Sequence, residues 1–149
     1  MTERLKILAV DDEQVILDSA KKMLDSERLQ VLTATDAEVA LQILEAETPD
    51  IMISDLVLPG ASGMELLDIA SEQDPTLLII ITTGYSTVEN AVAALKHGAF
   101  DFLPKPFTFD ELLSCVTRAC RASELRLTLG TRMLGAGHRG DFHLGAGGG

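Results

Sequence analysis

Aromatic residues are scarce in this chain of 149 residues, which contains no tryptophan, one tyrosine and five phenylalanines. Apolar residues still make up 46% of the chain, enough for one hydrophobic core built mainly from aliphatic side chains. No apolar run approaches the roughly 20 residues that a membrane-spanning helix needs, and the first residues do not resemble a signal peptide. The sequence therefore predicts a globular, cytoplasmic protein without membrane contact.

Cysteine is rare as well, with two residues in the whole chain. Cys115 and Cys120 are five positions apart in one predicted helix and therefore lie on different faces of it. Such a pair predicts neither a disulfide framework nor a metal site. Two isolated thiols are typical of a protein in a reducing compartment, which agrees with the cytoplasm.

Positively charged residues are scarce too. The chain has 12 Lys and Arg residues and 23 Asp and Glu residues, which give a net charge of -11. This balance argues against direct binding to nucleic-acid phosphates. All but two of the acids precede residue 122, whereas eight of the 12 glycines lie from Gly130 onward. We therefore expect an acidic domain over residues 1–122. Residues 123–149 are expected to form a helix extension and a glycine-rich tail, either a flexible linker or residues added by cloning.

Short aliphatic runs alternate along the chain with segments of helical period. The runs are Leu5–Val10, Val31–Ala34, Ile51–Ile53, Leu77–Ile81 and Phe102–Leu103. Near-continuous runs of this kind are typical of parallel strands that helices cover on both faces. Right-handed crossovers place the intervening helices on the two sides of such a sheet. The sequence thus predicts an α/β fold, a (βα)5 doubly wound five-stranded parallel sheet.

The starts of four helices can be located from the spacing of a capping box, in which a hydroxyl residue precedes a glutamate by three positions. The pairs are Thr35/Glu38, Ser62/Glu65, Ser86/Glu89 and Thr108/Glu111. The apolar positions Leu125 and Leu127 continue the last helical pattern towards Leu129, so we expect that helix to extend beyond the domain.

Polar residues stand where the predicted strands end. Asp11 and Asp12 follow the first strand, Asp55 the third, Thr82 and Thr83 end the fourth, and Lys105 follows the fifth. An aspartate such as Asp12 also suits a helix N-cap, but Asp55 is a lone acid in an apolar stretch. Ligands of open parallel sheets bind beyond the carboxyl ends of the strands. We expect the chemistry of this protein at that edge.

Carboxylates brought together in this way repel one another unless a cation is present. Mg²⁺ prefers hard oxygen ligands and is typically held by one or two carboxylates together with phosphate oxygens. Three carboxylates against Mg²⁺ and the ammonium of Lys105 sum to zero charge. The residue types therefore predict a magnesium site prepared for a phosphoryl group.

The same residues closely resemble a known family. The motifs are Val10–Glu13, Ser54–Asp55 with Leu58–Gly60, Thr82–Tyr85 and Gly98–Phe107. Together they look like the receiver domain of two-component response regulators over about residues 4–122. The last motif most resembles the receivers of NtrC-type regulators, which also carry an ATPase and a DNA-binding module. The resemblance implies a flavodoxin-like sheet with strand order 2-1-3-4-5.

The resemblance also implies roles for individual residues. Asp55 matches the phosphoacceptor, which takes a phosphoryl group from a sensor histidine kinase, a phosphotransfer protein or a small phosphodonor. Asp11 and Asp12 match the acidic pair that holds Mg²⁺ together with Asp55, and the backbone carbonyl of Val57 matches a further ligand. Lys105 matches the lysine that pairs with the phosphoryl oxygens.

A second group of matches concerns signalling. Thr83, rather than Thr82, stands at the spacing of the switch hydroxyl, and Phe102 at that of the switch aromatic. The bond before Pro106 is expected to be cis. Phosphorylation would then change the surface around the fourth helix, the fifth strand and the fifth helix. A homodimer through that surface is one arrangement the resemblance allows. Arginines on the last helix, such as Arg118, are expected mostly to be solvated, and a pairing of Arg118 with Asp101 across a dimer interface is the alternative.

Two neighbouring positions bear on the lifetime of the phosphoryl group. Val57 and Tyr85 lie two positions beyond Asp55 and Thr83, where the family tunes the access of water. Neither side chain offers a carboxylate or an amide to guide a water molecule, so the sequence predicts slow hydrolysis.

The sequence thus predicts a phosphorylation-activated signalling switch, which catalyses only its own phosphorylation and dephosphorylation. Three alternatives stay open. An aspartyl phosphatase or phosphotransferase would need a second acid at the position of Val57. A nucleotide- or flavin-binding module would need a phosphate-binding loop where Asp12–Gln14 stand. A pseudo-receiver that acts only as an interaction surface would not need the intact set of acids with Lys105. The kinase, the effector and the oligomeric state are not encoded in any motif.

Overall fold

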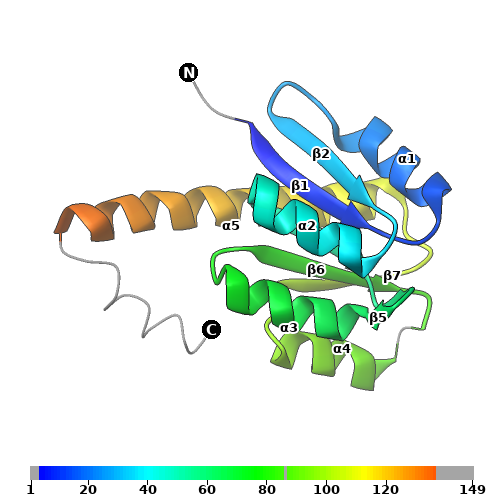
Figure 1. The fold of residues 1–149 in the computed structure, drawn as a ribbon. Helices are drawn as coiled ribbons and strands as arrows, with labels where there is room; N and C mark the ends of the chain where they lie inside the picture. The colour runs from blue at the N-terminus through cyan, green and yellow to red at the C-terminus, as the bar shows by residue number, and fades with distance from the viewer. Residues whose placement is uncertain (1–3, 86, 137–149) are drawn as a thin grey trace.

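The computed structural model describes residues 4–85 and 87–136, and side chains as far as residue 126. Strands and helices alternate as the aliphatic runs predict (Figure 1). The elements are β1 (Leu5–Val10), α1 (Gln14–Leu24), β2 (Leu29–Ala34), α2 (Ala37–Glu47), β3 (Ile51–Asp55), β4 (Val57–Leu58), β5 (Ala61–Ser62), α3 (Gly63–Gln73), β6 (Leu78–Thr83), α4 (Val88–Lys96), β7 (Asp101–Pro104) and α5 (Phe109–Ala136).

Five of the strands form one parallel sheet in the order β2-β1-β3-β6-β7. Counting only these strands, β6 and β7 are the fourth and fifth, so the predicted order 2-1-3-4-5 is confirmed. The short strands β4 and β5 form a separate antiparallel hairpin that the aliphatic runs did not predict. Pro59 and Gly60 make its turn, and Gly60 adopts a φ of 82°, which a glycine accepts without strain.

Successive strand residues face opposite sides of the sheet and build two half-cores. On one side, residues such as Met52 and Ile79 pack with α2, α3 and α4. On the other side, Ile53 and Ile80 pack with the last turn of α1 and with α5. Both half-cores are aliphatic and almost fully buried. This double covering explains why the strands are continuous apolar runs rather than alternating ones.

The helix starts test the predicted capping boxes. Ser62 and Glu65 form one at α3, with both reciprocal hydrogen bonds present, and the Thr108 pair forms the same two bonds before α5. At α2 the predicted cap Thr35 is wrong by one residue, because the carboxylate of Asp36 accepts the N–H of Val39. At α4 the cap is Thr87, also one residue later than predicted. The predicted cap Ser86 lies outside the described residues.

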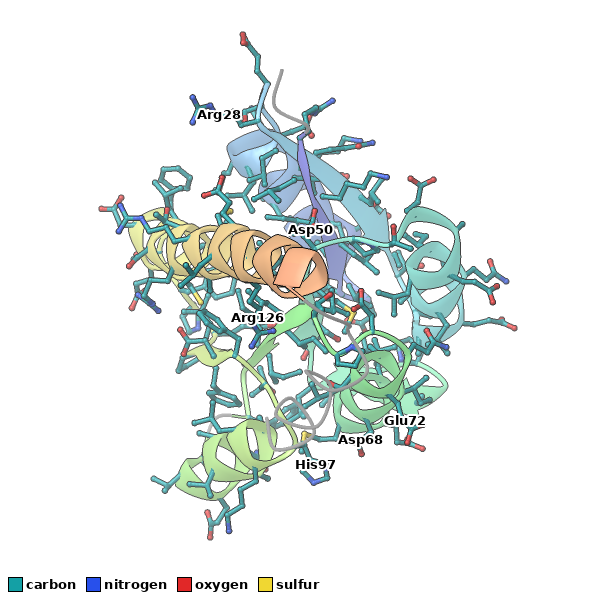
Figure 2. The ribbon with its side chains drawn as sticks, turned by 90° about the vertical axis from the view of Figure 1, so that its left-hand side faces the viewer. Arg28, Asp50, Asp68, Glu72, His97 and Arg126 are labelled. Atoms are coloured by element: carbon teal, nitrogen blue, oxygen red, sulfur yellow. The ribbon has the colours of Figure 1, made fainter. Side chains whose placement is uncertain are left out.

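Helix α5 continues well past residue 122, as the pattern of leucines predicts, and projects beyond the edge of the sheet in Figure 1. Near that edge, the Arg126 guanidinium donates to the carbonyl oxygen of Thr76, 3.4 Å away. Figure 2 looks along α5 and also shows His97, the residue after α4, beside Asp68 of α3, where Nδ1 and Oδ1 are 2.8 Å apart. Across the described part of the chain, no helix has the length and hydropathy needed to span a membrane. The predicted glycine-rich tail beyond residue 136 lies outside the described residues.

Candidate functional site

Side chains from three strands meet at the carboxyl edge of the sheet. Asp11 directly follows β1, Asp55 ends β3, and Lys105 directly follows β7. Parallel pairing aligns Val10 with Ser54, so Asp11 and Asp55 leave adjacent strands at the same level. The residues that the sequence placed at this edge, up to 94 positions apart, are therefore neighbours in the folded chain.

Lys105 connects the two buried acids. Its Nζ donates to Oδ2 of Asp11 at 2.7 Å and to Oδ2 of Asp55 at 2.9 Å. The side chain of Lys105 is 16% exposed, and those of Asp11 and Asp55 are 5% and 10% exposed. Burial alone would lower the pKa of Lys105, but the hydrogen bonds and charges of both carboxylates outweigh it and raise the pKa. Lys105 is therefore charged at neutral pH.

The backbone around Asp55 is tightly constrained. Oδ1 of Asp55 accepts the N–H of Val57 at 3.1 Å, so that each carboxylate oxygen has a partner. Gly63, at the start of α3, donates its N–H to the carbonyl of Leu56. A Cβ at Gly63 would lie 2.3 Å from the carbonyl oxygen of Asp55, so only glycine fits there. The loop after β3 thereby fixes the direction of the Asp55 carboxylate.

Three carboxylates gather around this point. Oxygen atoms of Asp11, Asp12 and Asp55 all lie within 4.8 Å of one another, with Asp12 exposed and the other two buried. Asp12 caps no helix, because Glu13 is the N-cap of α1 and its N–H is taken by Oδ1 of Asp11. Three hard oxygen donors against one lysine leave an excess of negative charge. This donor set fits a divalent cation such as Mg²⁺.

The predicted switch residues lie on the other face of β6 and β7. Thr83 is fully buried, and its hydroxyl accepts the N–H of Tyr85 at 3.0 Å, while its carbonyl accepts the N–H of Lys105. Within the described part of the chain, the Thr83 side chain makes no hydrogen bond to Asp55. Phe102 is half-buried and packs against the half-core under α4. The structure thus brings the acids and Lys105 together, whereas the Thr83 hydroxyl is bound to the N–H of Tyr85.

Two further features concern the β6 and β7 ends. The bond between Lys105 and Pro106 is cis, as the resemblance implied.

Thr82 is a further residue of this edge, to which the sequence analysis assigns no role. Its backbone is in register with Asp55, and it is 3% exposed. The only sequence signal was a second hydroxyl at the end of an otherwise aliphatic strand.

A second charged cluster lies on β7 and α5, away from the three acids. The guanidinium of Arg118 donates to Oδ2 of Asp101 at 2.5 Å, and the Cys115 thiol donates to the same oxygen at 3.3 Å. Arg118 of α5 and Asp101 of β7 therefore pair within one chain, and a pairing of the same residues across a dimer stays a prediction. Burial, then Asp101, raises the pKa of Cys115 to about 12. Burial would raise the pKa of Asp101, but the hydrogen bonds from Arg118 and from the N–H of Phe102 outweigh it. The pKa of Asp101 is therefore lowered.

Comparison with known proteins agrees with this geometry. Residues 7–117 match the family model described as the response regulator receiver domain. The C4-dicarboxylate transport transcriptional regulatory protein DctD of Pseudomonas aeruginosa is 37% identical over 138 residues, which are 93% of this chain and 30% of DctD. The DNA-binding transcriptional regulator NtrC of Proteus hauseri is 39% identical over 113 residues, 76% of this chain and 24% of NtrC.

A solved structure agrees over nearly its whole length. The receiver domain protein of Clostridium thermocellum superposes with a TM-score of 0.75 at 35% sequence identity, covering 81% of this chain and 98% of that one. By contrast, the chain spans only 30% of DctD and 24% of NtrC. The likeness to those regulators is therefore a likeness to one of their parts.

Proposed function

Because this chain belongs to the family of response regulator receiver domains, we propose that Asp55 is its phosphoacceptor and that a sensor histidine kinase or phosphotransfer protein is the donor. Receiver domains are signalling modules of two-component systems that phosphorylation activates. A receiver implies a histidine kinase as partner. Asp55 is the acid best placed for the role, because it is buried, paired with Lys105 and held by the N–H of Val57.

The transfer is a displacement at phosphorus. An oxygen of Asp55 forms a bond to phosphorus while the bond from phosphorus to the donor's histidine nitrogen breaks, and the imidazole keeps that electron pair. Lys105 is within reach of the oxygens that gain negative charge, and its raised pKa keeps it a cation. Fixed positive charge at a phosphoryl group is the main source of catalysis in such reactions.

We assign the metal position to Asp11, Asp12 and Asp55, with the carbonyl of Val57 as a further ligand. A Mg²⁺ ion held there would neutralise charge on the phosphoryl oxygens. The excess of carboxylate over Lys105 supports this assignment, because three acids so close together favour a divalent cation. Asp12, exposed at the rim, is the member of the set that solvent reaches most easily.

The signal then passes to the opposite face of β6. We propose that the Thr83 hydroxyl leaves the N–H of Tyr85 and donates to the phosphoryl group, and that Phe102 moves into the space that Thr83 vacates. Helix α4 begins a few residues after Thr83, so its first turn moves with that loop. The surface formed by α4, β7 and α5 would change, and a homodimer through it is one possible consequence. Exposed apolar side chains on α4, such as Val88 and Leu95, support a docking role for this surface.

We further propose that residues 1–122 form the receiver domain and that residues 123–149 form a helix extension and a glycine-rich tail. The continuous helix α5 through residue 136 supports the helix extension. The chain covers 30% of DctD and 24% of NtrC, which is the share expected of a single domain of such regulators.

The single observation that carries the proposal is the bridge from Lys105 to both Asp11 and Asp55 beside an exposed Asp12. The test is incubation with acetyl phosphate and Mg²⁺, followed by intact mass measurement of the wild type and the Asp55→Asn variant. We expect one added phosphoryl group on the wild type and none on the variant. Beryllofluoride with Mg²⁺ should shift the size-exclusion elution only of the wild type if activation causes dimerisation.

Two controls make the result specific. Asp50→Asn changes an acid at the opposite end of the sheet and should leave the phosphorylation unchanged. Addition of EDTA should stop the reaction of the wild type. If Asp55→Asn gains the same mass as the wild type, another residue is the acceptor and the assignment of Asp55 is wrong.

A further inference from the structure

Thr82 is a buried hydroxyl residue that the proposed reaction does not use. It lies on β6 in register with Asp55 of β3, and paired residues of parallel strands point to the same face of a sheet. That face is the one that α1 and α5 cover, because Ile80, two residues earlier, packs in their half-core. Thr83 points to the opposite face, so the two adjacent threonines serve different sides of the sheet.

Lys105 must pass over Thr82 to make its contacts. The strand order is β1-β3-β6-β7, so a side chain that starts after β7 crosses β6 before it reaches Asp55 and Asp11. Thr82 is the β6 residue that faces this path at the level of Asp55. Thr82, Lys105 and Asp11 also line the same groove between α1 and α5, which measures about 620 Å³.

The Thr82 hydroxyl is directed at this groove rather than sealed in the core. Thr82 as a residue is 3% exposed, and within the described part of the chain its Oγ1 takes part in no hydrogen bond. Because no buried side-chain oxygen of the described residues lacks a partner, Oγ1 is an atom that solvent in the groove reaches. A threonine hydroxyl has two acceptor lone pairs, so the groove offers an acceptor close to the path of Lys105.

The ammonium of Lys105 needs such an acceptor once Asp55 reacts. It carries three N–H donors, and the two acids accept one each in the present arrangement. Formation of the acyl phosphate removes the negative charge from the Asp55 carboxylate and puts it on the phosphoryl oxygens. The N–H that now donates to Asp55 turns towards those oxygens. The ammonium thereby loses its contact with the Asp55 carboxylate and keeps the one with Asp11.

We propose that Thr82 is a positioning residue for Lys105, whose Nζ donates to Oγ1 of Thr82 when Asp55 carries a phosphoryl group. This rests on the proposed function and extends it by one residue. The hydroxyl replaces a contact that the reaction weakens and keeps the ammonium directed at the phosphoryl oxygens. A valine at the same position has the same shape but could not accept the hydrogen bond.

The test compares three variants in acetyl phosphate and Mg²⁺. Thr82→Val removes the hydroxyl, Thr82→Ser keeps it, and Thr33→Val makes the same exchange at a half-buried threonine of β2. We expect Thr82→Val to phosphorylate about tenfold more slowly than the wild type, the size of one hydrogen bond to a charged group. Thr82→Ser and Thr33→Val should stay within about twofold, the spread of a replacement that keeps the interaction.

The exchange of the Lys105 ammonium protons with water, followed by NMR, shows whether Thr82 positions the ammonium or only fills space. In the beryllofluoride complex, the ammonium protons of Lys105 should exchange with water faster in Thr82→Val than in the wild type and in Thr82→Ser. In the resting protein the exchange should be the same in all variants, because Asp11 and Asp55 hold the ammonium there.

Two results would overturn the inference while leaving the proposed function intact. One is a Thr82→Val variant that reacts as fast as the wild type. The other is a Thr82→Ser variant that is as slow as Thr82→Val, which would show that the methyl group and not the hydroxyl matters. If the wild type and Thr33→Val also fail to gain phosphate, the proposed function itself is wrong and the inference is lost with it.

Discussion

Two charged clusters in this molecule use the same kinds of side chain for different purposes. One joins Asp11, Asp55 and Lys105 at the carboxyl edge of the sheet, and the other joins Asp101 to Arg118 on β7 and α5. The first is nearly buried and has more acid than base. The second is 31% to 55% exposed on its side chains and is balanced, with one acid and one base.

The difference shows which ion pairs indicate function. A balanced surface pair contributes little to stability and carries no chemistry. A buried cluster with uncompensated negative charge is costly to form, and the fold tolerates it where a ligand completes the charge. Here the third acid, Asp12, is exposed and completes a set of three carboxylates that is able to hold a metal ion. The imbalance of charge under burial, rather than the number of ion pairs, marks the functional site.

Removal of the basic side chain from each cluster should give the largest difference in unfolding free energy between the two clusters. Lys105→Met leaves Asp11 and Asp55 buried beside each other without their shared partner, and we expect a loss of about 3 kcal/mol of unfolding free energy without Mg²⁺. Arg118→Met removes an exposed partner and should change the midpoint of urea unfolding only slightly. Urea titration by circular dichroism at neutral pH measures both variants.

Mg²⁺ provides the control for this contrast. If it binds the acids, it should recover part of the stability of Lys105→Met and leave Arg118→Met unaffected. Equal losses in the two variants would contradict the view that burial separates the clusters.

The balanced cluster should respond to acid in a defined direction. The lowered pKa of Asp101 means that its carboxylate stabilises the fold above pH 3.8 and that this contribution is lost as the pH falls through the lower folded value. Asp101→Ala leaves the N–H of Phe102 and the thiol of Cys115 without an acceptor, so we expect a loss of about 1 kcal/mol at neutral pH. The difference from the wild type, followed by urea unfolding, should shrink below pH 3.8.

A difference that persists at the lowest pH at which both proteins fold would contradict this assignment. Asp36→Ala is a suitable comparison, because Asp36 also accepts a backbone N–H, but at the start of α2 and with no basic partner among the residues that the structure describes. Its effect should not depend on Arg118.

Much of this contrast could be predicted from the sequence, because the strands are continuous aliphatic runs and the polar residues follow them directly. Asp11, Asp55 and Lys105 stand one or two residues after such runs, so the parallel topology was sufficient to bring them to one edge. The order of the strands and the roles proposed for the acids required the family motifs, since periodicity does not specify which strands are neighbours.

The remaining features depend on side-chain geometry that a linear pattern does not contain. Asp36, rather than Thr35, caps α2, because only the backbone conformation decides which of two adjacent polar residues faces the free N–H groups. Arg118 reaches Asp101 within the chain, where the sequence suggested mainly a solvated side chain. Thr82 differs from Thr83 only in the face of the sheet that it occupies, and a one-residue change of register would exchange their roles.

Asp12, the exposed acid of the first cluster, should show how much the excess of negative charge lowers the unfolding free energy. Asp12→Asn removes one negative charge from beside Asp11 and Asp55, so we expect it to raise the unfolding free energy by up to about 1 kcal/mol without Mg²⁺. It should also reduce the stabilisation that Mg²⁺ provides, which thermal melts at increasing Mg²⁺ measure.

The matched variant is Asp18→Asn on α1, an exposed acid that pairs with Gln14 and lies outside the cluster. It should change neither the stability without metal nor the response to Mg²⁺. If Asp12→Asn and Asp18→Asn respond alike, the effect of Mg²⁺ is one of general screening, and the three acids are not its site.

The smallest expected effect concerns the apolar rim of the same cluster. Val57 is 52% exposed beside Asp55, and Tyr85, beyond Thr83, is 71% exposed. Neither has a carboxylate or amide that could direct a water molecule at the phosphoryl group. Val57→Asn adds such a group and should shorten the half-life of the acyl phosphate about threefold, the size of one net hydrogen bond. Loss of the added mass after removal of the phosphodonor measures it.

Val39→Asn makes the same exchange at an exposed valine of α2 and should leave the half-life unchanged. The comparison is informative because both variants keep every charge of the cluster in place, so the imbalance that favours phosphorylation is the same in each. A shorter half-life in Val57→Asn alone would mean that charge prepares the site for phosphorylation, while the uncharged rim sets how long the phosphoryl group remains. An unchanged half-life would mean that water reaches phosphorus without guidance from Val57.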